Sequence, residues 1–303
     1  LVGSEMCIRD RYTTVFTELK QPAAKINYDE SKVPVYTLPD VLTLRNGKKV
    51  TTEREWMKKR RPELLHLFET QVYGKAPARP KDLHFRLLTE DKNALNGLAT
   101  RKEVAVYLTK DEKHYLTVLM YLPNRRKGTV PMFFGINFKG NHAIHPDEGI
   151  TFPSEERMIA YGRKRMFPRG SAASRWPVEM LMEHGYGLAT FYRGDIDPDF
   201  DDGFQNGVHP LYYKKGQTRP AEDEWGTLAA WAWGMSCAMD YFETDKDIDA
   251  KRIAIFGHSR LGKTTLWAGA IDPRFALVIS NDSGCGGAAL SRRKFGETVR
   301  AVN

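Results

Sequence analysis

The chain has 303 residues, 41% of them hydrophobic, and a formal net charge of +8. This length suffices for one sizeable α/β domain, and since no apolar run approaches the about 20 residues of a membrane-spanning helix, we expect no membrane segment. The positive charge could favour an acidic polymer, but Lys and Arg are scattered without a long basic block, so we expect no nucleic-acid partner.

The N-terminal residues differ from the rest of the chain. Residues 1–24 do not begin with Met and lack the apolar region of a signal peptide, so we interpret them as a sequencing or cloning remnant and a disordered lead. Residues 25–303 then form a single domain. The three cysteines, Cys7, Cys237 and Cys285, are too few for a disulfide framework or a zinc site.

The first predicted elements are a helix and a set of strands. A helical pattern starts at Thr52, Pro62 marks a break or a second helix start, and Gly74 ends it. Residues 83–122 alternate apolar and polar positions, which predicts antiparallel strands with turns near Asn96 and Asp111.

A nearly continuous apolar run at 130–137 predicts a central strand that is buried on both faces. The loop that follows contains His142 and His145. Paired histidines can bind a metal, but nothing nearby completes a ligand set, so we predict a hydrogen-bonding role in the loop and no metal site.

A predicted helix at 176–184, ended by Gly185, precedes a strand at 187–192. An acidic loop comes next, with alternate spacing that is superficially typical of calcium binding: Asp195, Asp197, Asp199, Asp201 and Asp202. It lacks the closing glutamate of an EF-hand at the required spacing, so a solvated or hydrogen-bonded loop is favoured. Residues 224–243 show helical spacing of apolar residues, with Cys237 as a core residue. Strands and helices alternate from there, which predicts parallel strands.

The most informative stretch is 252–270. An apolar β-branched run stops at Gly257, Ser259 follows two residues later, and a helical pattern begins at once. A serine on such a turn is typical of the nucleophile elbow of an α/β-hydrolase, a three-layer sandwich with a mostly parallel central sheet. The usual pattern is Gly-x-Ser-x-Gly, whereas here the second glycine comes one residue late, at Gly262, after Leu261.

Two other interpretations fit the same residues. The segment 257–264 matches the phosphate-binding pattern G-x-x-x-x-G-K-[ST], in which Lys263 would reach the phosphates and Thr264 would hold magnesium, with Asp282 as a later magnesium-binding aspartate. Against it, only about forty residues follow for a fold that is usually built downstream of its phosphate loop. The other interpretation is a structural turn with an incidental serine.

Several segments resemble the glucuronoyl esterases, carbohydrate esterase family 15, and their bacterial members in particular. They are residues 137–142, 174–177, 194–199, 257–263 and 281–290, and the resemblance extends from about residue 25 to the end. The late glycine is that family's form of the turn. The resemblance implies hydrolysis of the ester between 4-O-methyl-glucuronic acid of xylan and an alcohol of lignin, through an acyl-enzyme. It also implies a secreted or periplasmic monomer without metal or cofactor.

The resemblance assigns roles to four residues. Ser259 is the nucleophile, Arg260 stabilises the oxyanion, and Lys263 contacts sugar hydroxyls of the glucuronoyl group. For Arg260 and Lys263 the alternatives are a structural ion pair and a surface lysine. Asp282 lies where many relatives have the triad acid, although a later acid or a role in capping the turn is a close alternative.

A serine nucleophile also needs a histidine base, and all eight histidines precede Ser259. His258 is its neighbour and cannot fold back to serve it. Either the chain is not a serine hydrolase, or it ends before its histidine. We favour the second and expect the 303-residue chain to be inactive. An acetyl xylan esterase and a non-catalytic carbohydrate-binding protein remain alternatives.

Overall fold

The computed structural model describes residues 26–154, 157 and 166–297, and the proposed N-terminal lead lies outside them. Within this part of the chain one sheet has seven strands in the order β1-β2-β3-β5-β4-β6-β7. The strands are β1 (His84–Ala94), β2 (Ala99–Tyr107), β3 (Tyr115–Pro123), β4 (Val130–Asn137), β5 (Gly187–Tyr192), β6 (Ile248–His258) and β7 (Leu277–Asn281).

The sheet has an antiparallel half and a parallel half. Strands β1, β2 and β3 form the predicted antiparallel meander, and β3 also pairs antiparallel with β5. Parallel pairing is confined to β5, β4, β6 and β7. Because the carboxyl ends of these four strands meet at one edge of the sheet, the loops that follow them lie together, where open α/β sheets bind their ligands.

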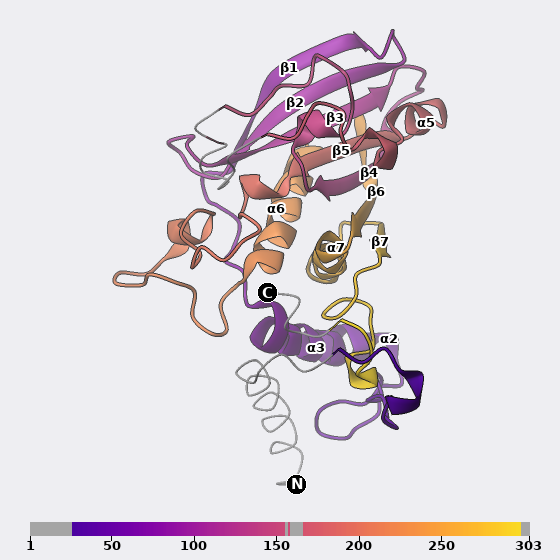
Figure 1. Ribbon diagram of the computed structural model, residues 1–303, viewed down its shortest axis with the longest axis vertical. Helices are drawn as coiled ribbons and strands as arrows, with labels where there is room; N and C mark the ends of the chain where they lie inside the picture. The colour runs from indigo at the N-terminus through magenta and orange to yellow at the C-terminus, as the bar shows by residue number, and fades with distance from the viewer. Residues whose placement is uncertain (1–25, 155–156, 158–165, 298–303) are drawn as a thin grey trace.

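Helices cover the sheet on both faces, which gives three layers (Figure 1). Helices α6 (Thr227–Phe242) and α7 (Arg260–Ile271) pack on one face, and α5 (Val178–Glu183) packs against β3 and β5 on the other. The pleat of β3 shows the division, since Val118 and Met120 belong to the core under α6 and α7, whereas Leu119 and Tyr121 belong to the core under α5. The predicted α/β-hydrolase sandwich is confirmed.

Helix α6 is buried on nearly all sides. Trp231 and Trp233 are at most 1% exposed, and Cys237 is fully buried, so the predicted core position of Cys237 is confirmed. A helix that is apolar all round belongs in the interior, where it packs against several neighbours at once. In the described part of the chain, no helix combines the length and the hydropathy that a membrane crossing requires.

The N-terminal helical region is continuous but irregular. It comprises α2 (Glu53–Glu55), a π-helical turn (Trp56–Arg60), α3 (Arg61–Phe68) and a second π-helical turn (Glu69–Tyr73), and it ends at Gly74 with φ 80°. Pro62 lies in the first turn of α3, so it marks the point where the π-helical turn gives way to α-helix within this continuous run. Short 3-10 turns are Glu30–Lys32, Asn141–Ala143, Ala173–Arg175, Arg193–Asp195, His209–Tyr212 and Ser291–Arg293.

Candidate active site

A single residue, Ser259, joins β6 to α7. Its backbone has φ 57° and ψ −127°, a strained conformation for a residue with a side chain. Three backbone hydrogen bonds hold it there: its N–H donates to the Asn281 carbonyl on β7 (3.0 Å), and its own carbonyl accepts from Gly262 (2.9 Å) and Lys263 (3.1 Å). The turn therefore presents the Ser259 side chain at the carboxyl edge of the sheet, as the nucleophile elbow requires.

Two glycines allow strand and helix to approach this closely. A Cβ at Gly257 would overlap the Leu261 carbonyl and lie 2.5 Å from Thr265 Oγ1. A Cβ at Gly262 would lie 3.0 Å from the Asn281 carbonyl oxygen, while Leu261 is 2% exposed and belongs to the core. The late second glycine thus falls where α7 passes the end of β7.

The turn leaves no loop for a phosphate. Only Ser259 separates β6 from α7, whereas a phosphate-binding loop needs several residues with free backbone N–H groups. Thr264 is fully buried, and its hydroxyl donates to the Arg260 carbonyl (3.0 Å) instead of facing a site for magnesium. The geometry does not support the nucleotide interpretation.

Arg260 begins α7 directly beside Ser259. As the first helical residue, it has a backbone N–H outside the intrahelical ladder, which leaves a donor for an oxyanion. Its side chain is 48% exposed, and Nη1 donates to Asp199 Oδ1 (2.6 Å). The ion pair that sequence reasoning considered for Arg260 therefore exists, and its partner comes from the acidic loop.

That acidic loop is hydrogen-bonded, as predicted. Asp197 is 1% exposed, and its carboxylate accepts from Thr227 Oγ1 (2.7 Å) and pairs with His209 Nδ1 (3.1 Å). Asp199 pairs with Arg193 and Arg260. Among the residues described, no group of three or more His, Cys, Asp or Glu side chains is arranged to hold a metal ion.

Lys263 lies one turn along α7 and is 3% exposed, so the surface-lysine alternative is wrong. Its Nζ is 3.6 Å from Glu297 Oε2, which also accepts the Cys285 N–H (2.9 Å). Sequence reasoning missed Glu297, because nothing in the local pattern marks a loop residue 34 positions after Lys263 as its partner.

Asp282 follows β7 directly. It has φ 48° and is exposed, and its carboxylate has no hydrogen bond within the described ranges. The turn after it is capped by Ser283, whose Oγ accepts the Ala288 N–H (2.9 Å), so the structure gives the capping role to Ser283. The role of Asp282 as triad acid stays a prediction.

Tyr73 links the segment after β7 to helix α7. Its hydroxyl donates to the Gly286 carbonyl (2.7 Å), and its ring stacks on Trp267 of α7 with centroids 4.7 Å apart. Burial raises the pKa of Tyr73 to about 12, so the hydroxyl remains a donor at all ordinary pH values.

No histidine in the described ranges donates to, or accepts from, Ser259. His258 Nδ1 lies 3.1 Å from Asn281 Nδ2. His142 and His145 hold the loop after β4, as predicted: His142 Nε2 is 3.0 Å from the Phe167 carbonyl oxygen, and His145 Nε2 is 2.8 Å from Glu179 Oε1. The structure thus brings together Ser259, Arg260, Lys263 and the end of β7, and within the described ranges no histidine is bonded to Ser259.

Comparison with known proteins gives consistent matches. Residues 180–301 match the family model described as glucuronyl esterase, fungi. The chain is 52% identical over 284 residues to "Carbohydrate esterase MZ0003" of an unknown prokaryotic organism, and the match covers 91% of this chain and 65% of that protein.

Two solved structures are similar over most of this chain. One is a glucuronoyl esterase from Solibacter usitatus, with 47% identity, a TM-score of 0.80, and coverage of 87% of this chain and 68% of that one. The other is a promiscuous CE15 esterase from a marine bacterial metagenome, with 51% identity, a TM-score of 0.80, and coverage of 92% and 71%. The chain thus spans about two thirds of the length of these relatives.

Proposed function

Because the chain belongs to the glucuronoyl esterases of carbohydrate esterase family 15, we propose that it is a serine esterase. Its substrate would be the ester between (4-O-methyl-)glucuronic acid of xylan and an alcohol of lignin. The observation that carries the proposal is the strained turn at Ser259, which joins β6 directly to α7. Arg260 and Lys263 lie in the first turn of that helix. The family resemblance supplies the substrate class.

The proposed reaction has two steps. Ser259 Oγ attacks the ester carbonyl carbon while a histidine base takes its proton, and the resulting oxyanion accepts hydrogen bonds from the Arg260 N–H and guanidinium. The C–O bond to the alcohol then breaks, and the alcohol leaves with that proton. Water, deprotonated by the same base, attacks the acyl-enzyme and releases glucuronate and free Ser259. Loss of one oxyanion donor costs about 3 kcal/mol of barrier.

Lys263 is suited to recognise the sugar. An ammonium group has three donors, and the ion pair with Glu297 at 3.6 Å is a loose one, so donors remain for hydroxyl groups of the glucuronoyl ring. Burial of Lys263 strengthens such hydrogen bonds because little water competes for them. The carboxylate of Glu297 keeps the charge of this lysine compensated.

The source of the histidine base stays a prediction. Since no histidine of the described residues contacts Ser259, the expectation is a histidine from outside the 303 residues, on a loop after a strand, with Asp282 or another acid behind it. The sequence of the intact gene tests this directly, and a gene without such a histidine would remove the basis of the mechanism.

The test of the function uses the protein expressed from its intact gene. We expect turnover of a methyl or benzyl ester of glucuronic acid, and loss of turnover in Ser259→Ala with an unchanged melting midpoint. Lys263→Ala should raise KM for the glucuronate ester more than for a simple aryl acetate. Preferred release of acetate from acetylated xylan would favour an acetyl xylan esterase. Xylan binding without any turnover would favour a binding protein.

The location and assembly state are part of the same proposal. A lignin–xylan ester is polymeric and lies outside the cell, so we expect a secreted or periplasmic protein. We also expect a monomer that binds no nucleic acid. Cell fractionation and light scattering of the purified protein test it.

A further inference from the structure

Arg260 needs help to act as an oxyanion donor. Its side chain is 48% exposed and stands at the first position of a helix, where a long flexible guanidinium would sample many rotamers. An oxyanion donor acts only when it is held in place before the reaction, since misplacement by about 1 Å can cost a factor of about 100 in rate. The hydrogen bond from Nη1 to Asp199 Oδ1 is the side-chain contact of Arg260 within the described residues.

Asp199 is itself firmly held. Its side chain is 17% exposed, and its second oxygen, Oδ2, is 3.0 Å from Arg193 Nη2. The Arg193 guanidinium is 10% exposed and lies within 6 Å of the rings of Phe138, Tyr192 and Trp231. Asp199 therefore connects an anchored, aromatic-lined arginine with the exposed arginine at the elbow.

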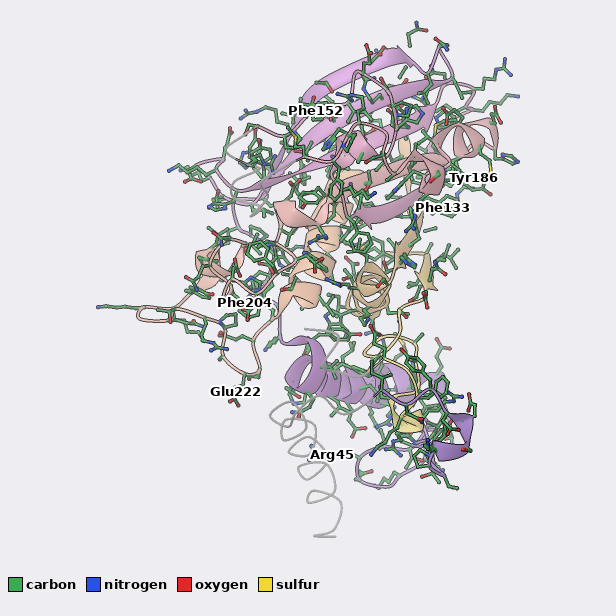
Figure 2. All side chains as sticks on the ribbon, in the orientation of Figure 1. Arg45, Phe133, Phe152, Tyr186, Phe204 and Glu222 are labelled. Atoms are coloured by element: carbon green, nitrogen blue, oxygen red, sulfur yellow. The ribbon has the colours of Figure 1, made fainter. Side chains whose placement is uncertain are left out.

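The backbone of the loop is also anchored. Two residues before Asp199, the Asp197 carbonyl accepts the Trp231 Nε1–H (2.9 Å), and the Asp197 carboxylate is bonded to α6 and to His209. Phe204, on the far side of the loop, packs against His209 with ring centroids 4.8 Å apart, and Figure 2 shows it within this loop region beside α6. The position of Asp199 is thus fixed by the interior of the protein.

The charge count explains why such a carboxylate does not abolish the function of Arg260. A carboxylate paired with a single arginine would cancel its charge. Here the two carboxylate oxygens are divided between two guanidinium groups, since Oδ2 is 3.0 Å from Arg193 and Oδ1 accepts from Arg260. Asp199 can therefore orient Arg260 without giving its whole charge to that one arginine.

We propose that Asp199 is a positioning residue for the esterase reaction: it relays the fixed position of Arg193 to the guanidinium of Arg260 and so preorganises the oxyanion site. This inference rests on the proposed function for its kinetic consequence, but not for the orientation of Arg260. Asp199→Asn is the informative change, because it keeps the size of the side chain and removes its charge. The matched control is Asp201→Asn on the same loop, where the exposed side chain accepts the Gly203 N–H and has no ion pair with any residue that the structure describes.

Kinetics of the protein from the intact gene give the first readout. Asp199→Asn should lower kcat at least 10-fold and leave KM within about twofold, because the interaction is realised in the transition state. Asp201→Asn should behave as wild type. In an Arg260→Ala background, Asp199→Asn should add less than a twofold loss, since it acts through Arg260. The proposal would be overturned if Asp199→Asn lowered kcat as much in the Arg260→Ala background as in the wild type. It would also be overturned if Asp199→Asn and Asp201→Asn had equal effects on kcat.

NMR relaxation of the Arg260 Nε–Hε group gives a readout that needs no turnover, with the signal assigned by its absence in Arg260→Ala. We expect an order parameter near 0.85 in wild type and below about 0.6 in Asp199→Asn. If the wild type fails to cleave glucuronate esters, the proposed function fails, and this measurement still decides the inference. If Asp199→Asn does not fold, the wild-type value decides it, because a flexible Arg260 there refutes the inference.

Discussion

Replacement of Gly257 by alanine should open the elbow. The added Cβ would overlap the Leu261 carbonyl and lie 2.5 Å from both the Leu261 carbonyl carbon and Thr265 Oγ1, against an ordinary contact distance of about 3.5 Å. Strand β6 and helix α7 would have to separate by about 1 Å. Because the nearest obstacles are backbone atoms of a buried helix, we expect the substitution to lower the free energy of unfolding by about 3 kcal/mol or more, at the upper end of the range for overpacked sites.

The assay combines stability with chemistry. For a chain of 303 residues, 3 kcal/mol corresponds to a fall of about 5 °C in the melting midpoint, measured by circular dichroism. The protein from the intact gene should also lose at least 10-fold in the rate at which a fluorophosphonate labels Ser259, since the nucleophile moves with the turn. The matched control is Gly226→Ala, where the nearest atom to an added Cβ is 3.9 Å away and the cost should stay below about 1 kcal/mol. A Gly257→Ala protein that melts and labels like wild type would refute the close approach of strand and helix.

Three further changes test the rest of the structure. Trp267→Ala should lower the free energy of unfolding, measured by urea titration, by about 3–5 kcal/mol, because Trp267 is 3% exposed. The control Met57→Ala, at a position that is 52% exposed, should lower it by less than about 0.5 kcal/mol. Burial raises the pKa of the Cys237 thiol and shields it from reagents. In a variant with no other cysteine, Cys237 should therefore react with a disulfide reagent only as the protein unfolds. Rapid reaction in native buffer would contradict its burial. The Lys102 ammonium, 2.9 Å from Asp247 Oδ2, lowers the pKa of that carboxyl against the opposing effect of burial. The carboxylate therefore stabilises the fold above the ordinary aspartate pKa of about 4 and loses this effect as the pH falls through its lowered pKa. Asp247→Asn should flatten the acid decline of the melting midpoint and leave the slope between pH 5 and 7 unchanged.

The sequence was sufficient where a feature is local. The strands at Val130–Asn137 and Gly187–Tyr192 have the predicted bounds, because each is an apolar run between turn-forming residues. The elbow was also predictable, since Gly257 and Ser259 sit at a change from a β pattern to a helical one. These features depend on neighbours that the sequence shows directly.

Features that depend on distant pairings were not predictable in the same way. The Lys263 side chain follows a helical pattern that suits a surface residue equally well, but in the fold it is buried, with Gly284 and Glu297 of the segment after β7 beside its Nζ. The partner of Arg260 is 61 residues away, on an acidic loop that the sequence predicts to be solvated or hydrogen-bonded without indicating which of its carboxylates meets Arg260. Asp199 and Glu297 acquire their roles from tertiary contacts, for which no local pattern exists.

The hydrogen bond from the Ser259 N–H to the Asn281 carbonyl has a consequence for how the protein matures. The meander β1–β3 joins neighbours in sequence, so it can assemble early, whereas β4 pairs with β5 and with β6, and β6 begins more than a hundred residues later. Strand β7 comes later still, and it supplies the carbonyl that holds the turn. The Ser259 turn can therefore be complete only after β7, which follows the serine in the chain, has been synthesised and has paired with β6.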